Sequence, residues 1–307
     1  MKAETIKKAI KKSYGAIAKD EIQGGCCGTE PGCCGTGGLS SAMIQQYGEI
    51  EGYHKEADLS LGCGLPTEIA NISEGDTVID LGSGAGNDAF IARSIVGEHG
   101  KVIGIDMTPE MVIKALRNNQ RLGFQNVEFL LGEIENMPQV QNNTADVVIS
   151  NCVMNLVPDK EKAFREVFRV LKTGGHFSIC DIVFTGALSK GMLEAAELYA
   201  GCVAGASEKG AYLGIIKSVG FKNIRIKSER KIDIPDDFLL KYVDSRELKV
   251  LKETGSHLYS VTIYAEKLDD GSCCDPLDGE CCGSEENKGT GNTTCCATET
   301  DGEKGCC

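Results

Sequence analysis

The sequence predicts an α/β fold with a mainly parallel sheet, and three observations support this. Strand-like apolar runs alternate with helix-like segments over residues 77–184, as in successive βαβ units. The first strand ends at an acid and runs directly into a glycine turn, VIDLGSGAGNDAF, over residues 78–90. A second strand at 102–105 ends at Asp106, 20 residues after Gly86, where a βαβ unit offers a carboxylate to a ribose diol. A nucleotide-like ligand is therefore expected at the carboxyl edge of the sheet.

The glycine turn defines the first βα unit. Gly82, Gly84 and Gly86 follow the strand over 77–81, and without Cβ atoms their backbone can approach a ligand closely. Asp80 precedes them, and Asp80-x-Gly82-x-Gly84-x-Gly86 resembles the turn of S-adenosylmethionine-dependent methyltransferases rather than the GxGxxG dinucleotide turn. An acid there repels a pyrophosphate but can face an ammonium group. A tight turn that binds nothing is the alternative interpretation.

Other elements are expected on both sides of this unit. An amphipathic helix at 3–19 precedes a mobile, glycine-rich loop at 24–38 that carries two Cys-Cys pairs. A helix runs from Gly86 to about Val96, and the helix after Asp106 begins with Thr108 as N-cap and Pro109 at its first position. Further strands are predicted at 127–131, 145–150, 175–184, 224–226 and 258–265, helices at 160–171 and 212–219, and a small-residue loop at 199–206.

Charge and composition exclude several classes of partner. The 307 residues carry a formal charge of −13 and a pI near 4.9, so the chain lacks the basic surface that binds nucleic acid. The basic first residues are followed by no apolar signal region and no membrane-spanning run. We therefore expect a cytoplasmic protein that binds neither nucleic acid nor a membrane.

Sixteen cysteines in such a chain favour soft-ion chemistry over a disulfide scaffold, because the cytosol keeps thiols reduced. Twelve of them form adjacent pairs near the two ends, whereas Cys63, Cys152, Cys180 and Cys202 stand alone. Cys180 lies in an apolar strand and is interpreted as a small core residue, with a catalytic role as the alternative. The other three lie in loops expected at the ligand edge of the sheet. Three thiolates could therefore converge there on one trivalent soft ion.

These motifs together resemble the arsenite S-adenosylmethionine methyltransferases over about residues 24–267. The resemblance rests on LGCGLP around Cys63, DLGSGAGND, GIDMT, SNCVMNLVPDK around Cys152 and GCVAGA around Cys202. It implies a class I, Rossmann-like, seven-stranded sheet. We divide the chain into an N-terminal helix and Cys-rich loop (1–60), a cofactor-binding core (61–185), arsenic-binding and C-terminal strands (186–267) and a disordered, acidic Cys-pair tail (268–307).

The resemblance implies that Cys63, Cys152 and Cys202 bind As(III), which accepts a methyl group from S-adenosylmethionine without a general base, for arsenic detoxification. A further family cysteine matches Cys33 or Cys34, with Cys26 and Cys27 also open, and it would resolve an oxidised product by forming a disulfide with Cys63. The substrate would be arsenite or its thiol conjugates, and the reductant a thiol such as glutathione or thioredoxin. The tail could collect a soft ion or simply be solvated.

The cofactor contacts are assigned along the strand ends. Asp80 and the three glycines are expected at the methionine tail, and Asp106 with Met107 at the ribose. The adenine would contact Glu133, Ile134 and Glu135, and Asn151 would line the methyl site. For Glu135 a solvated loop acid is an equal alternative. Leu61 departs from the family, where an aromatic residue often precedes the GCG sequence.

Two other functions compete with arsenic methylation. The first is a methyltransferase for a small organic substrate, in which the cysteines only pack. The second is a thiol-rich protein that binds soft metals on a methyltransferase scaffold. Titration with S-adenosylmethionine and with arsenite separately distinguishes the three, because the first rival ignores arsenite and the second ignores the cofactor.

Overall fold

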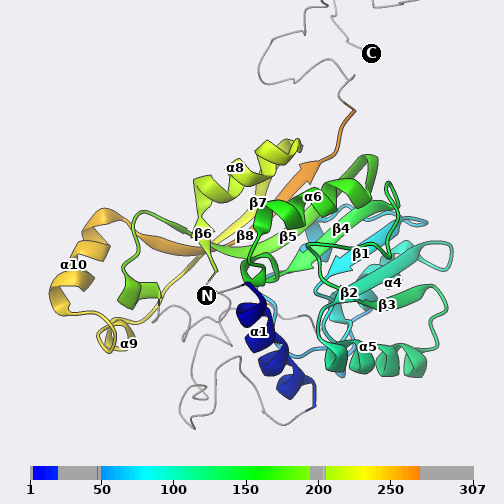
Figure 1. Cartoon of the computed structure of the whole chain (residues 1–307), viewed down its shortest axis with the longest axis horizontal. Helices are drawn as coiled ribbons and strands as arrows, with labels where there is room; N and C mark the ends of the chain where they lie inside the picture. The colour runs from blue at the N-terminus through cyan, green and yellow to red at the C-terminus, as the bar shows by residue number, and fades with distance from the viewer. Residues whose placement is uncertain (1–2, 20–46, 48–49, 194–202, 204, 270–307) are drawn as a thin grey trace, which may run out of the picture. The chain divides into compact units, whose positions relative to one another are not determined.

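The computed structural model describes residues 3–19, 47, 50–193, 203 and 205–269 (Figure 1). The chain divides into two compact units, residues 1–267 and 268–307, and the first contains every helix and strand given below. The predictions for the loop at 24–38, for Cys202 and for the acidic tail beyond 269 lie outside the described residues.

One mixed sheet forms the centre of the first unit, with the strand order β3-β2-β1-β4-β5-β8-β7. Neighbouring strands from β3 to β5 are parallel, whereas β8 runs antiparallel to β5 and β7, and the short β6 pairs in parallel with the end of β5. The predicted, mainly parallel α/β sheet is therefore confirmed. The strands are β1 (Thr77–Leu81), β2 (Lys101–Asp106), β3 (Val127–Leu131), β4 (Ala145–Asn151), β5 (Leu171–Thr185), β6 (Ser207–Glu208), β7 (Lys222–Ile232) and β8 (His257–Glu266).

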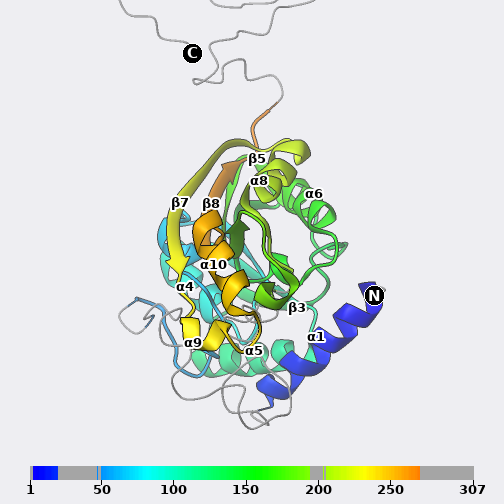
Figure 2. The ribbon, with the colours of Figure 1, turned by 90° about the vertical axis from the view of Figure 1, so that its left-hand side faces the viewer.

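Helices cover both faces of this sheet, with α6 and α8 on one side and α4 on the other (Figure 2). The strands supply an apolar side chain to each face in turn, because successive residues of a strand point to opposite sides. In β1, Val78 packs with α4 and α5, whereas Ile79 packs with α6 and α8. The helices are α1 (Ala3–Ala18), α3 (Pro66–Ile69), α4 (Asn87–Val96), α5 (Pro109–Leu122), α6 (Lys160–Val170), α8 (Lys209–Val219), α9 (Asp236–Leu239) and α10 (Ser245–Thr254), with a 3-10 turn η2 (Met154–Leu156).

Two helix starts differ from the prediction in their chemistry. The Thr108 side chain makes no capping bond at the start of α5, and the Asp106 carboxylate instead accepts a bond of 2.7 Å from the Thr108 N–H. Helix α8 begins at Lys209 rather than at residue 212, because the Glu208 carboxylate accepts from the Ala211 N–H at 2.9 Å. A side-chain cap is therefore present at the start of α8 but absent at the start of α5.

Two short helices, α9 and α10, were not predicted. They enclose a small apolar cluster of Met192, Leu239, Val243, Leu248 and Leu251, separate from the clusters on the sheet. Strands β5 and β7 are also longer than expected: β5 begins earlier, where Leu171 pairs with Ala145 of β4, and β7 pairs with β8 along most of its length. Within the described ranges, none of the helices has the length and apolar character needed to span a bilayer.

Candidate active site

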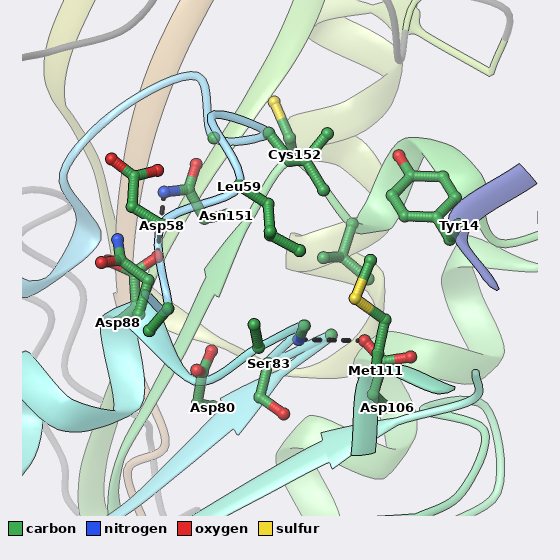
Figure 3. Close-up of a pocket in the computed structure, with 18 of the residues that line it drawn as sticks. Tyr14, Asp58, Leu59, Asp80, Ser83, Asp88, Asp106, Met111, Asn151 and Cys152 are labelled. Atoms are coloured by element: carbon green, nitrogen blue, oxygen red, sulfur yellow. Dashed lines mark hydrogen bonds between the residues drawn. The ribbon is translucent and has the colours of Figure 1, made fainter. Parts of the chain in front are cut away.

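Two adjoining pockets open where the parallel strands end. The glycine turn, Asp106, Asn151 and Cys152 line the first (Figure 3). The second extends along the end of β3 toward α1, and Gly82, Asp106 and Tyr14 line both. Ligands of open parallel sheets bind at this edge, and an elongated ligand could occupy both pockets.

The three glycines of the turn have different surroundings. All have positive φ, 67° at Gly82, 51° at Gly84 and 100° at Gly86, a conformation that favours glycine. A Cβ on Gly82 would lie 2.3 Å from Val153, whereas one on Gly84 would have no atom within 4 Å and would enter the pocket. Gly86 lies against Phe90 and lines neither pocket. Only two of the predicted glycines therefore face the ligand space.

Asp106 is held in one orientation by the backbone around it. One carboxylate oxygen accepts from the Gly84 N–H at 3.0 Å and the other from the Thr108 N–H at 2.7 Å. Burial raises the pKa of Asp106, and these backbone bonds oppose the rise. Each oxygen keeps a lone pair that can face the pockets.

A cluster of buried acids surrounds the glycine turn. Asp80, Asp88 and Asp106 are all buried, and Figure 3 shows the three around the first pocket. Burial, and then repulsion from Asp88 and Asp106, holds the pKa of Asp80 well above its usual range. Burial raises the pKa of Asp88 to about 6. Within the described residues, one Asp80 oxygen, Oδ2, is buried without a hydrogen-bond partner. The pocket therefore suits a ligand that brings positive charge.

The second pocket lies between α1 and the end of β3. Lys7 and Ile10 form one wall, and Met107 and the segment 132–135 form the other. Lys7 Nζ donates to Glu133 at 2.7 Å and pairs with Glu135. Glu135 is buried and also accepts from the Asp159 N–H at 3.2 Å, so it is not a solvated loop acid. The predicted adenine residues Glu133, Ile134 and Glu135 all line this pocket, as does Met107, which was predicted at the ribose.

Two of the predicted arsenic ligands meet. Cys63 and Cys152 are joined in a disulfide with 5.9 Å between their Cα atoms, although the sequence predicts reduced thiols. Cys152 lines the first pocket, across from Asp80 and Ser83 (Figure 3), and has a left-handed φ of 61°, a strained conformation found often at functional sites. Cys202 and Cys34 lie outside the described residues. Among the residues that the structure describes, no three His, Cys, Asp or Glu side chains form a metal cluster.

Asn151 connects the cysteines to the acids. Its Oδ1 accepts from the Cys63 N–H at 2.9 Å, and its Nδ2 donates to Asp88 at 3.0 Å and to the Tyr47 hydroxyl at 2.7 Å. Asn151 was predicted at the methyl site, whereas no role there was predicted for Tyr47 or Asp88. An acid in the first turn of α4 was the available signal for Asp88, whereas no sequence pattern marked Tyr47.

The remaining described cysteine, Cys180, is a core residue as predicted. It is free and fully buried, and its thiol shares a hydrogen bond of 3.0 Å with the Thr262 hydroxyl. Burial raises the pKa of Cys180 to about 12, so the thiolate that would attack or bind a soft ion is disfavoured.

Leu61, at the position where the family often has an aromatic residue, lines the first pocket and packs in one cluster with Tyr14 and Met111.

Comparison with known proteins gives consistent matches. A family described as a methyltransferase domain matches residues 72–220. An arsenite methyltransferase of Halobacterium salinarum is 39% identical over 244 residues, 80% of this chain and 59% of that protein. An arsenite methyltransferase of Rattus norvegicus is 33% identical over 231 residues, 70% of this chain and 59% of that protein.

Solved structures agree with these matches. The crystal structure of an arsenic(III) S-adenosylmethionine methyltransferase from Chlamydomonas reinhardtii is similar with a TM-score of 0.58 and 33% identity, covering 70% of this chain and 69% of that one. The YcgJ protein of Bacillus subtilis, at 22% identity and a TM-score of 0.54 over 66% of this chain and 96% of that one, shows the shared fold alone. The chain spans about three fifths of the length of the two curated relatives.

Proposed function

Because the chain belongs to the arsenite methyltransferase family, we propose that it transfers the methyl group of S-adenosylmethionine to trivalent arsenic held by cysteine sulfurs. One observation carries the proposal: Cys152, bonded to Cys63, lines the same pocket as the glycine turn and its buried acids. The Cys152 sulfur, which can bind soft ions, and the buried acids, which attract a cation, thus line the same pocket. Arsenic detoxification is the expected biological role.

The acids are suited to the charged part of the cofactor. S-adenosylmethionine carries an ammonium group and a sulfonium centre whose methyl carbon is open to nucleophilic attack. The unpartnered oxygen of Asp80 would accept a bond from the ammonium group, and Asp88 adds negative charge beside it. Asp106 would accept from the ribose hydroxyls. The bound cation would relieve the repulsion among the acids, and this relief would contribute to the binding free energy of the cofactor.

The second pocket is suited to the adenine. Met107 and Ile134 offer apolar surface, and Glu133 and Glu135 offer acceptors at its edge. Helix α1 would close the pocket through Lys7. Excluding water in this way strengthens the polar contacts around the ligand.

The arsenic site requires the reduced form of the disulfide. Cys63 and Cys152 would bind As(III) as thiolates, and Cys202 would be the third ligand. Val203, which follows Cys202 in the chain, is fully buried in the apolar cluster that contains the other two cysteines, and this supports the grouping. The arsenic lone pair would then attack the methyl carbon in line with the departing sulfur, so no side chain needs to remove a proton.

Thiol exchange would regenerate the site. Two reduced thiols supply the two electrons that convert the Cys63–Cys152 disulfide into two thiols, and they become a disulfide themselves. Free glutathione, a thioredoxin-type protein, or Cys34 with its neighbours in the N-terminal segment are the proposed donors. The reduction precedes arsenic binding.

The decisive experiment combines reduced protein, labelled S-adenosylmethionine, arsenite and a thiol, and separates the methylated arsenic species. Cys152→Ser and Cys202→Ser should each abolish arsenic methylation while S-adenosylmethionine still binds. Cys180→Ser is the matched control, because it removes a lone buried thiol that lines neither pocket. Unchanged turnover in Cys152→Ser would reject the assignment.

A further inference from the structure

The residues that follow Cys202 are anchored to the fold. Val203 is fully buried in the apolar cluster of the disulfide. The Ala206 N–H donates to the Val203 carbonyl at 2.8 Å, which closes a turn. The next two residues form β6, which pairs with the end of β5. We call residues 203–206 the Cys202 turn; of these, 203, 205 and 206 are described.

Gly205, inside this turn, lies directly against the backbone of Asn155. A Cβ on Gly205 would lie only 1.8 Å from the Asn155 carbonyl oxygen, so any side chain is excluded there. Asn155 is itself fixed, because its Nδ2 donates to the Ile182 carbonyl at 2.7 Å. Asn155 stands three residues after Cys152, and Gly205 stands three residues after Cys202. Gly205 and Asn155, which follow the two cysteines in the chain, therefore pack backbone to backbone.

Lys160, in the first turn of α6, also bonds to Gly205. Its Nζ donates to the Gly205 carbonyl at 2.6 Å. Burial lowers the pKa of Lys160, and the Asp181 carboxylate opposes this effect. Asp181 is fully buried and accepts a bond of 3.2 Å from the Tyr212 hydroxyl. A buried acid thus supports a cation whose hydrogen bond ends on the Cys202 turn.

We infer that Lys160 is a positioning residue for arsenic: through the Gly205 carbonyl it holds the residues that follow Cys202 against Asn155, and losing this hold would weaken the contribution of Cys202 to the proposed arsenic site. Lys160 lines neither pocket and acts only through this turn. The inference rests on the proposed function, because it requires Cys202 to be an arsenic ligand.

Lys160→Met tests the inference, since it keeps the apolar stem and removes the donor. The arsenite KM should rise about 10- to 100-fold, the usual effect of losing a hydrogen bond from a charged group. The dissociation constant of S-adenosylmethionine should stay unchanged, because Lys160 touches neither pocket. Arsenic X-ray absorption should show two sulfur neighbours in place of three. Lys160→Arg, which keeps a charged donor, should restore part of the affinity.

Lys162→Met is the matched control, because Lys162 lies on the same helix, is exposed and makes no bond to the turn; it should behave as the unmodified chain. A Lys160→Met protein with unchanged arsenite KM and three sulfur neighbours would overturn the positioning role. Should that variant not fold, Gly205→Ala keeps Lys160 and separates the two segments, and an unchanged arsenite KM there would count equally against the inference. Cys202→Ser distinguishes the two proposals: if it also keeps three sulfur neighbours, the arsenic site itself is wrong.

Discussion

The side chain of Asn151 accepts a hydrogen bond of 2.9 Å from the backbone N–H of Cys63. The same side chain donates to Asp88 at 3.0 Å, so one amide joins the cysteine loop to an acid of the first pocket. Gly62 packs against this amide so tightly that a Cβ would lie 2.7 Å from its nitrogen. Together with the Tyr47 hydroxyl, which donates to the Gly64 carbonyl at 2.9 Å and to Asp88 at 3.2 Å, this amide helps to fix the position of the disulfide relative to the glycine turn.

Asn151→Ala should remove the link between the cysteine loop and Asp88. It leaves the Cys63 N–H and the Asp88 carboxylate without their shared partner, and each lost bond to a buried group is worth about 1–3 kcal/mol. We expect kcat/KM for arsenite to fall at least about tenfold, with a weaker effect on the affinity for S-adenosylmethionine. Steady-state kinetics with each substrate varied in turn measures both. Equal losses for both substrates would argue against a link that mainly positions the sulfurs.

Asp80→Asn should lower the affinity for the cofactor and raise the stability of the ligand-free protein. The carboxylate of Asp80 is buried among like charges, which holds its pKa well above the usual range, so a neutral amide should raise the free energy of unfolding without ligand. The same change removes the proposed partner of the cofactor ammonium, and affinity should fall about 10- to 100-fold. Calorimetric titration and thermal unfolding test the two halves. Glu98→Gln, at an exposed site, is the control for the loss of one negative charge.

Cofactor binding should strengthen as the pH rises through about 6. The pKa of Asp88 is raised from 3.8 to about 6 in the folded chain, so between these values the folded state binds more protons than the unfolded state. The ligand-free protein therefore loses stability as the pH rises through this window. A cationic ligand prefers the ionised acid and should release protons on binding near pH 6. Titration in buffers of different ionisation enthalpy measures that release, and Asp88→Asn should remove most of it.

Oxidised and reduced protein should differ in arsenic binding. With Cys63 and Cys152 joined, neither sulfur can act as a thiolate ligand, so the oxidised protein should bind arsenite far more weakly. Reduction should expose both thiols to alkylation, and arsenite should then protect them. Mass spectrometry of the alkylated peptides locates the change. Arsenite protection of the buried Cys180 alone would contradict the assignment.

Lys7→Met should weaken the wall of the second pocket. Lys7 pairs with Glu133 and Glu135 across that pocket, and its loss leaves the buried Glu135 without a cation. The KM for S-adenosylmethionine should rise about three- to tenfold, for a loss on the order of 1 kcal/mol, while the arsenite KM should change little. Lys8→Met, at an exposed position of the same helix, should change neither value.

Local patterns were sufficient to predict the core of the fold. The apolar run of β1, the glycine turn and Asp106 define a βα unit from adjacent residues, and the structure has them at the expected bounds. Strand β7 was predicted too short because residues such as Lys227 and Arg230 interrupt its apolar pattern. Its length comes from pairing with β8, a contact between distant parts of the chain that no local pattern specifies.

Site residues that belong to a sequence motif were predicted, whereas residues that only tertiary packing brings to the site were not. Asp80, Asp106 and Asn151 lie at the carboxyl ends of β1, β2 and β4 and all line the first pocket. Tyr47 reaches that pocket from a segment without periodicity, and its hydroxyl bonds to Asp88. The Cys63–Cys152 bond was not expected either, because composition indicates the redox environment of a chain but not the oxidation state of one pair.

The docking of α1 also affects the chain that follows it. The segment between Lys19 and Tyr47, which holds Cys26, Cys33 and their neighbours, is tethered at one end by a helix that packs on α5 and at the other by a side chain that lines the first pocket. We propose that the thiols of this segment compete with free thiols as partners for Cys63.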